Sequence, residues 1–432
     1  MTTLQEAHPV TARRLGLGEL RVRLHGVSLL RYTLALYLAS RLLYLVIAAV
    51  AMLAVDTLGS HTGLATTLNW QGLPLSHSTL GSEMSNWDGE WYLRTAATWY
   101  YHHVVRASGA YTTLGFMPLY PMAIWFVAHI LPIGDLGAAI AIAMVAGGVG
   151  TLLAAKLAEE WWGEAAARRA ITFWCFFPGT IVFSMVYSEG LTVALVAAAM
   201  LLLARRRWLW AGVAAGFATA VAPTDLVAVP MCLVAALLQW RRSGWSWRER
   251  HRRFGDREAR RSLLAVILAP LGAIGFGIYL WFWTGSPLAD YTAQHIEWSE
   301  STTPLAIPRV AKAFVHQLFI QGAGPRGPAG IDLNGVLALL GTAFLLFALK
   351  LMWDHRASVP ATAWVWSLGV AFLALTSAKT PPNPRILVDA FPLVLVVGMA
   401  LGERAYRRAM RYNLLATVVL SPITYVGLWL RP

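Results

Sequence analysis

Acidic side chains beside aromatic rings are the first feature of this sequence that could carry out chemistry. Asp88 lies between Trp87 and Trp91 in the segment 85–92, and Glu90 follows two positions later. An acid in such a partly dehydrated setting suits a general base, and tryptophan faces suit a bound sugar. An interfacial aromatic belt with an incidental acid explains the same pattern equally well. Asp88 and Glu90 could also share a divalent cation, although HExxH, CxxC and strict acidic DxD motifs are absent from the sequence.

A further acid, Glu189, follows Ser188 between two apolar runs. An ionisable group at such a depth in a membrane segment is costly, and it therefore suggests a function. The same pair is a typical helix start, with Ser188 as the N-cap and Glu189 in the first turn. The two interpretations are compatible with each other.

Cations suited to a phosphate occur in a short proline-rich turn near the end of the chain. Lys379 and Arg385 flank this turn, and a guanidinium can donate two parallel hydrogen bonds to a phosphate. Alternatively, both side chains reach towards lipid headgroups. His295, in a separate polar segment, could exchange a proton or bind a phosphate, although a single loop histidine more often does neither.

The elements that must position these residues are membrane helices. The chain has 432 residues, of which 57% are hydrophobic and only 13% are charged. Globular soluble proteins carry about 25% charged residues, so this composition excludes a soluble enzyme, a disordered chain and a disulfide scaffold. The net charge of +13 lies in short blocks between apolar runs, as the positive-inside rule produces, and this argues against a nucleic-acid partner.

The apolar runs predict an all-α polytopic membrane protein with about eleven transmembrane helices and two large outer loops. The positive-inside rule places the basic blocks in the cytoplasm. The first long polar loop must then lie outside and the next basic block inside, so the chain crosses the membrane only once between residues 116 and 155. Met117–Pro132 is therefore predicted to be an interfacial or re-entrant helix, and a full crossing is the alternative. The predicted spans are roughly Tyr32–Val55, Leu136–Ala155, Ile171–Tyr187, Leu191–Ala204, Trp208–Val221, Leu226–Trp240, Leu263–Trp283, Leu333–Trp353, Ala361–Ala378, Ile386–Gly402 and Leu414–Leu430.

This threading predicts four regions along the chain. They are a basic cytoplasmic segment 1–31, a transmembrane module 32–283 that includes the outer loop 56–135, a second outer loop 284–331, and C-terminal transmembrane helices 332–432.

Taken in order, the motifs resemble those of the PIG-V family, the GPI mannosyltransferase II family with its bacterial homologues, within the GT-C superfamily of polytopic glycosyltransferases. One departure is the turn 222–225, where the family often has Arg and Asn-Gly. The matching residues are Trp87-Asp88-x-x-Trp91-Tyr92, Phe116-Met117-Pro118-Leu119-Tyr120-Pro121, Pro178 with Tyr187-Ser188-Glu189, Gly285-x-Pro287-Leu288-Ala289 with Gln294 and Trp298, and Arg385 before Pro392.

The resemblance implies a GT-C-like fold and an inverting transfer of a hexose, with mannose as the expected sugar, from a polyprenyl-phosphate donor. The acceptor would be a glycolipid or a glycan on the outer face of a bacterial plasma membrane, with membrane lipids as further partners and with neither cofactor nor metal. Asp88 would be the general base, Glu189 would stabilise the oxocarbenium-like transition state, and Arg385 would bind the donor phosphate. The other expected substrate-binding residues are Trp87, Glu90, Trp91, Tyr92, Tyr120, Tyr187, Gln294, His295 and Lys379.

Two other functions fit part of the pattern. A transporter or flippase for lipid-linked sugars accounts for the spans and the intramembrane charges, but it does not readily account for a large aromatic loop that carries Asp88. A structural membrane subunit that assists another transferase predicts that substitution of Asp88 leaves the activity of the complex intact.

Overall fold

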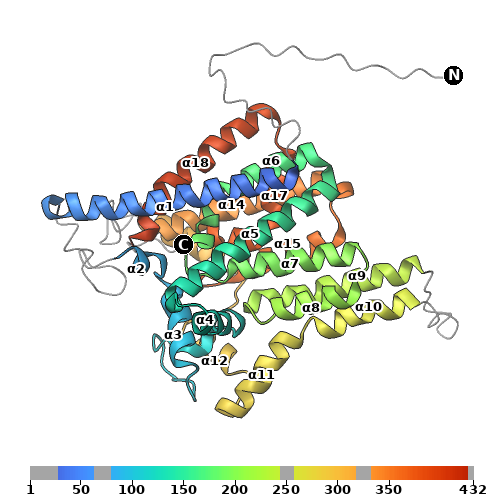
Figure 1. Ribbon diagram of the computed structural model, residues 1–432, viewed down its shortest axis with the longest axis horizontal. Helices are drawn as coiled ribbons and strands as arrows, with labels where there is room; N and C mark the ends of the chain where they lie inside the picture. The colour runs from blue at the N-terminus through green and yellow to red at the C-terminus, as the bar shows by residue number, and fades with distance from the viewer. Residues whose placement is uncertain (1–27, 63–78, 244–256, 318–331, 427–432) are drawn as a thin grey trace.

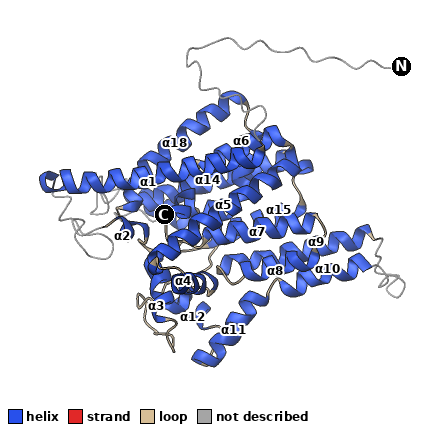
Figure 2. Ribbon diagram, viewed as in Figure 1, coloured by secondary structure: helices blue, strands red, loops and turns tan. Residues whose placement is uncertain are grey.

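The computed structural model describes residues 28–62, 79–243, 257–317 and 332–426. In these ranges the chain consists of helices and connecting loops without a strand, and Thr302 and Ser377 form one isolated antiparallel bridge (Figure 2). The predicted all-α class is confirmed. Parts of the segments 1–31, 56–135, 241–261, 284–331 and 414–430 lie outside the described residues.

The elements follow one another along the chain as shown in Figure 1, with 3₁₀ helices labelled η. They are α1 (Leu29–Thr62), α2 (Leu80–Met84), α3 (Asp88–Thr98), η3 (Thr113–Gly115), α4 (Leu119–Ile130), α5 (Gly134–Trp162), α6 (Glu164–Cys175), η4 (Pro178–Ser184), α7 (Glu189–Ala204), α8 (Trp208–Ala218), η5 (Pro223–Val227), α9 (Ala228–Arg242), α10 (Arg257–Leu268), α11 (Leu271–Thr284), α12 (Ala289–Ile296), α13 (Ala306–His316), α14 (Leu333–Asp354), η8 (Arg356–Ser358), α15 (Ala361–Thr376), α16 (Pro384–Asp389), α17 (Phe391–Ala400) and α18 (Glu403–Tyr425).

Five of the described helical segments are long and apolar enough to cross a membrane, and the pair η4 and α7 would make a sixth crossing that bends by 103°. Shorter apolar helices, namely α4, α8, α15 and α17, accompany them. The chain is therefore a multi-pass membrane protein. The structure thus has five such segments, or six with the bent pair, where about eleven spans were predicted, and the predicted spans Trp208–Val221, Ala361–Ala378 and Ile386–Gly402 fall on the shorter helices α8, α15, and α16 with α17. The five spanning segments are Leu29–Val55, Gly134–Trp162, Pro223–Arg242, Arg257–Thr284 and Leu333–Asp354.

The segment Met117–Pro132 forms the 12-residue helix α4. At 1.5 Å per residue its length is about 18 Å, which is well short of the roughly 30 Å hydrocarbon core of a bilayer. Figure 1 shows α4 nearly end-on, whereas α5 and α7 run across the view. The segment is thus a short helix that runs in a different direction from α5 and α7, and its interfacial or re-entrant position stays a prediction.

The predicted span Ile171–Tyr187 is wrong as a single helix. Helix α6 ends at Cys175, and the 3₁₀ helix η4 begins at Pro178. Proline lacks an N–H group and disfavours the helical conformation in the residue before it, and Phe177 is accordingly extended, with φ −68° and ψ 130°. The apolar run therefore breaks before it can cross the membrane as one helix.

A buried arginine supports this broken segment. Arg41 in α1 is 2% exposed and donates to the Thr180 carbonyl oxygen and to the Ser184 hydroxyl. Its guanidinium also packs over the Tyr44 ring, 4.7 Å from the centroid. Non-helical backbone at membrane depth needs such internal partners. Arg41 lies within the apolar run Tyr32–Val55, whose hydropathy does not indicate this role.

Two glycines allow the close helix contacts that set the candidate site. A Cβ atom on Gly190, at the start of α7, would lie 2.8 Å from the Ala143 carbonyl oxygen in α5. A Cβ atom on Gly179, in η4, would lie 1.9 Å from the Pro384 carbonyl oxygen at the start of α16. Small residues permit this close approach between membrane helices. The first turns of α7 and α16 are consequently held in fixed positions.

The two predicted outer loops meet each other and the proline-rich turn. Helix α3 packs against α4, and α12 packs against η3, at one corner of the molecule (Figure 1). Glu300, beyond α12, accepts hydrogen bonds from the Ser377 and Thr380 hydroxyls, each at 3.0 Å. These contacts bring three distant parts of the sequence to one region.

Candidate active site

Three charged residues from three helix starts form the centre of the candidate site. Asp88 is the first residue of α3, Glu189 is the first residue of α7, and Arg385 is the second residue of α16. The positive end of a helix dipole favours a carboxylate in the first turn. The helices α3 and α7 therefore each present an acid that their own backbone stabilises.

Arg385 joins the two acids. Its Nη1 atom lies 2.5 Å from the Asp88 Oδ2 atom, and its Nε atom donates to the Glu189 Oε1 atom. The guanidinium also lies over the Tyr187 ring, with the Arg385 Cζ atom 4.6 Å from the ring centroid. The three residues carry two negative charges and one positive charge, so the group keeps a net charge of −1.

The exposure of these side chains separates their roles. The Asp88 side chain is 32% exposed, the Arg385 side chain 17%, and the Glu189 side chain 5%. Glu189 therefore lies beneath Arg385, while Asp88 faces the surface. The role expected for Glu189, stabilisation of the transition state, stays a prediction, and in the structure its buried carboxylate contacts Arg385.

The ion pairs leave one nitrogen of Arg385 for the expected donor phosphate. The sequence assigns the guanidinium to this phosphate, and in the structure two of its three nitrogen atoms bind carboxylates. Only Nη2 is outside these ion pairs. An anion at this position would therefore meet one remaining nitrogen, not the two-pronged arrangement that guanidinium recognition of phosphate often uses.

The backbone just before Asp88 is strained. Trp87 has φ 64° and ψ −120°, a combination that non-glycine residues rarely adopt and that occurs mainly at functional sites. Behind it, the buried Asn86 side chain donates to the Tyr425 carbonyl oxygen at 2.6 Å, and the Tyr187 hydroxyl donates to the Asn86 carbonyl oxygen at 3.2 Å. These bonds fix the turn that presents Asp88.

Three tyrosines that were expected to bind substrate are instead buried. Tyr120 is fully buried and donates to the Ala139 carbonyl oxygen at 2.9 Å, and Tyr187 is fully buried beneath Arg385. The Tyr92 hydroxyl lies 2.8 Å from the Ser188 hydroxyl. Burial, together with the nearby Glu189 charge, raises the pKa of Tyr92 well above its usual range. All three rings pack beneath the site, and direct contact of these tyrosines with a substrate stays a prediction.

Next to the charged group lies an aromatic cluster, defined by Trp91, Tyr111, Phe116 and Trp298. The Trp91 and Trp298 rings meet edge to face with centroids 5.3 Å apart, and the Tyr111 and Trp298 centroids are 4.8 Å apart. Trp91 was expected from the sequence, but Tyr111 was missed because it lies in a loop without a distinctive motif. Such a partly exposed aromatic surface is suited to stacking on a sugar ring.

Three other expected binding residues take part in the loop contacts. Gln294 donates to the Gly115 carbonyl oxygen at 2.6 Å, and Lys379 donates to the Trp298 carbonyl oxygen while its ammonium lies 5.2 Å from the Tyr111 ring centroid. The His295 Nδ1 atom lies 3.0 Å from the Glu300 carbonyl oxygen, which accepts a hydrogen bond from it in the tautomer that carries the proton on Nδ1. Lys379 therefore borders the aromatic cluster, and in the described part of the chain no hydrogen bond or ion pair links Lys379 or His295 to Asp88 or Arg385. Glu90 is partly exposed beside Asp88.

Two acids that sequence analysis did not place in the site are buried nearby. Asp225 is fully buried and accepts a hydrogen bond from the Thr192 hydroxyl at 2.7 Å. Asp389 is 6% exposed, four positions after Arg385 on α16. An acid within an apolar run is itself a signal of function, and applying it to Asp389 would have found this residue. Within the described residues, no group of three or more His, Cys, Asp or Glu side chains is arranged to hold a metal ion.

No protein-family model and no curated protein matches this sequence. Among solved structures, the chain is similar to the apo form of the Archaeoglobus fulgidus oligosaccharyltransferase, with 15% identity and a TM-score of 0.38 over 90% of this chain. It is also similar to ArnT from Cupriavidus metallidurans, with 16% identity and a TM-score of 0.42 for the apo state over 84% of this chain, and with 15% identity and a TM-score of 0.43 for the form bound to undecaprenyl phosphate over 85% of this chain. The chain spans 55% of the length of the oligosaccharyltransferase and 61% of the length of ArnT.

Proposed function

We propose that this protein is a membrane glycosyltransferase of the GT-C type, which transfers a hexose from a polyprenyl-phosphate donor to a hydroxyl of a glycolipid or glycan. The observation that carries the proposal is the partly exposed Asp88 carboxylate, held by Arg385 beside the aromatic cluster. A base, a cation and a stacking surface are the parts that such a transfer needs. Mannose is the sugar that the resemblance to the PIG-V family favours.

The reaction would proceed by inversion at the anomeric carbon. The acceptor oxygen forms a bond to this carbon while the bond to the phosphate oxygen breaks, and the phosphate leaves with the electron pair. Asp88 takes the proton of the acceptor hydroxyl. Because its Oδ2 atom is engaged by Arg385, the other carboxylate oxygen, Oδ1, is the one positioned to receive this proton.

Arg385 and Glu189 support the transfer in different ways. The Arg385 Nη2 atom, outside both ion pairs, and the Lys379 ammonium are the cations proposed to meet the departing phosphate. Glu189 is a positioning residue, since it holds the guanidinium from beneath. A phosphate monoester is a good leaving group, so the proposal requires no strong general acid.

The cationic blocks support an orientation with the site on the outer face. The lipid tail of the donor would remain in the bilayer, and its phosphate would lie at the interface near α16. The Arg-rich composition, with 35 Lys and Arg residues of which four are Lys, favours a bacterial plasma membrane as the location.

Purified protein in nanodiscs, supplied with radiolabelled polyprenyl-phosphate mannose and a total lipid extract, tests this function. We expect a new mannosylated product whose formation depends on the protein. Movement of the labelled donor between leaflets without any new product would support a transporter or flippase and contradict the proposal. Mass spectrometry of lipids and glycans from a deletion strain, searched for one missing hexose, would then identify the acceptor.

A further inference from the structure

A cavity lies at the end of α7 that is remote from the candidate active site. Its volume is about 330 Å³, and its walls come from the C-terminal ends of α5, α7 and α9, from Trp208, and from the N-terminal end of α15. Met200, one of its lining residues, follows Glu189 by eleven positions on α7, which is about 16 Å along the helix axis. The cavity is therefore separate from the Asp88–Arg385 group.

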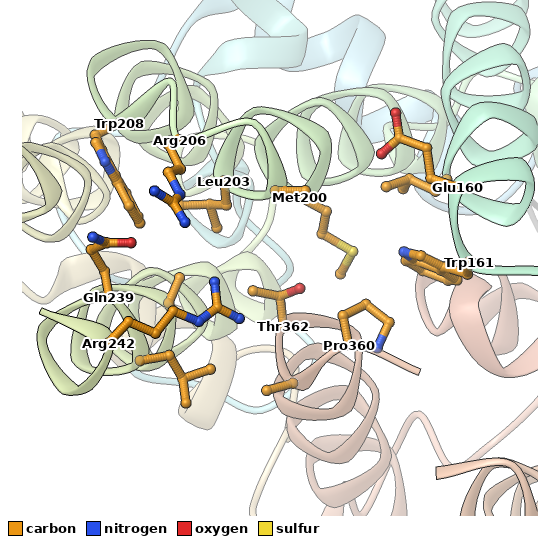
Figure 3. A pocket seen from close by; sticks show the side chains of 15 residues that line it. Glu160, Trp161, Met200, Leu203, Arg206, Trp208, Gln239, Arg242, Pro360 and Thr362 are labelled. Atoms are coloured by element: carbon orange, nitrogen blue, oxygen red, sulfur yellow. The ribbon is translucent and has the colours of Figure 1, made fainter. Parts of the chain in front are cut away.

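Two arginines without acidic partners face this cavity. Within the described residues, neither Arg206 nor Arg242 forms an ion pair or a side-chain hydrogen bond, and both side chains line the cavity and are exposed. Figure 3 shows their guanidinium groups on the same side of the cavity. Glu160 lies on the opposite side in Figure 3, and its carboxylate is already paired with Arg205 at 2.8 Å. The side of the cavity that carries the guanidiniums is thus positive.

A buried amide points to a bound ligand independently of these charges. Gln239 is 6% exposed and lines the cavity, and its side chain has no hydrogen-bond partner among the described residues. In Figure 3 the amide lies beside Trp208 and towards the two guanidiniums. The amide opens onto the cavity, where an anion would accept a hydrogen bond from its NH₂ group.

The start of α15 adds further donors. This 16-residue helix begins after Pro360 with no side-chain cap, and Pro360, Ala361 and Thr362 line the cavity. The first backbone N–H groups of a helix have no partner within the helix, and with the helix dipole they favour an anion. The two guanidiniums, the Gln239 amide and the start of α15 therefore all favour one small anionic group in the cavity.

The remaining walls are apolar and lie where membrane helices end. The polar side borders the basic blocks that we predict to be cytoplasmic, and tryptophans such as Trp161 and Trp208 favour the interface between membrane and water. A ligand that joins an anionic group to hydrocarbon fits both halves of the cavity. The apolar lining residues are Leu157, Leu203, Ala235 and Leu238.

We propose that this cavity binds the phosphodiester headgroup of an anionic membrane phospholipid, with Arg206, Arg242 and Gln239 as its ligands and the acyl chains directed along the apolar wall. Basic pockets between membrane helices bind such headgroups in other proteins. The site would tie the C-terminal ends of α7 and α9 to the start of α15. The proposal does not depend on the glycosyltransferase function.

Native mass spectrometry of the full chain in detergent, titrated with dioleoylphosphatidylglycerol or with dioleoylphosphatidylcholine, tests the proposal. We expect the wild type to retain the anionic lipid preferentially, and we expect the double variant Arg206→Gln/Arg242→Gln to bind it roughly tenfold more weakly or worse, since each lost charge-assisted contact is substantial. The matched control is Arg404→Gln/Arg408→Gln, which removes the same charge from exposed residues of α18 and should bind like the wild type.

A variant that leaves the charge of the protein unchanged shows whether weaker lipid binding comes from the cavity itself or from a general loss of folding. Thr362→Phe would fill the cavity and should also weaken binding of the anionic lipid, with an unchanged elution profile on size exclusion. Equal binding by the wild type, the double variant and Thr362→Phe would overturn the proposal. Equal losses in the test and control pairs would overturn it as well. If millimolar inorganic phosphate raises the thermal midpoint as much as the lipid does, and the same variants abolish both effects, the cavity takes free phosphate and the lipid proposal is wrong.

Discussion

The Nη1 atom of Arg385 lies 2.5 Å from the Oδ2 atom of Asp88, although the two residues are 297 positions apart in the chain. This contact joins the first turn of α16 to the first turn of α3. Because Glu189 holds the same guanidinium from beneath, the orientation of Asp88 depends on two further helices. The base that we propose is thus positioned by tertiary structure and not by its own loop alone.

Replacing Arg385 should weaken transfer in a graded way. Arg385→Ala leaves two carboxylates facing each other without a cation, and each lost charge-assisted contact is worth about 1.5 to 3 kcal/mol. We expect a rate loss of roughly 10- to 100-fold or more for Ala and a smaller loss for Arg385→Lys, which restores the charge but not both directed bonds. Initial rates against donor concentration, in one nanodisc lipid, measure this order.

The control for this series is Arg94→Ala. Arg94 is exposed on α3 and stacks over Trp91, with its Cζ atom 5.2 Å from the ring centroid, so its loss removes a nearby cation without disturbing the ion pairs. Identical curves for wild type, Arg385→Lys and Arg385→Ala would remove Arg385 from the site and leave Lys379 as the cation to examine.

Glu189 should act through Arg385 and not on the substrate. Glu189→Gln keeps the volume but removes the charge beneath the guanidinium, so we expect kcat to fall. In the double variant Glu189→Gln/Arg385→Lys the loss should be close to that of the more impaired single variant, because the two residues form one unit. Strictly multiplicative losses in this double-mutant cycle would show that Glu189 works independently of Arg385.

The close contact at Gly179 should make the stability of the protein sensitive to any larger residue at this position. A Cβ atom there would lie 1.9 Å from the Pro384 carbonyl oxygen, so Gly179→Ala must displace backbone at a cost of about 1 to 3 kcal/mol. We expect a lower thermal midpoint and reduced activity, since Arg385 follows Pro384. The control is Gly275→Ala, because a Cβ atom on Gly275 has no neighbour within 4 Å. A thermal midpoint that falls equally in both variants would contradict the proposed packing role.

The predicted orientation in the membrane can be tested with single cysteines. Ser299 is exposed in the second outer loop and Ser243 follows α9. In intact cells Ser299→Cys should react with an impermeant thiol reagent, whereas Ser243→Cys should react only after permeabilisation. The native Cys175 and Cys232 are buried, which keeps the background low. The reverse pattern of labelling would place the candidate site in the cytoplasm.

Hydropathy predicted the helical membrane class and most of the helices, because long apolar runs have few alternatives in a bilayer. The positions of the basic blocks between the apolar runs predicted that Asp88, Glu189 and Arg385 lie on the same side of the membrane. They did not predict that the guanidinium lies between the acids. That arrangement depends on close helix packing at Gly179 and Gly190, which no local pattern encodes.

The errors have identifiable physical causes. The run Ile171–Tyr187 is continuously apolar, yet Pro178 breaks the helix. Proline removes a backbone hydrogen-bond donor, and this effect is not contained in the mean hydropathy of the run. Arg41 and Asp389 were hidden because averaging over a window conceals one charged residue. The burial of Tyr120 and Tyr187 followed from tertiary packing. An aromatic residue in a loop motif can stack on a ligand or support the backbone, and its type alone does not distinguish these roles.

The most direct test of the central claim is the turnover of Asp88→Asn compared with wild type, with radiolabelled polyprenyl-phosphate mannose in the same nanodisc lipid. This change keeps the shape of the side chain and removes the base, so turnover should fall by roughly 10² to 10⁴ while the protein stays folded on size exclusion. Glu90→Gln, a change two residues away, should retain most of the activity. Near-native turnover by folded Asp88→Asn would contradict the assignment of Asp88 as the base.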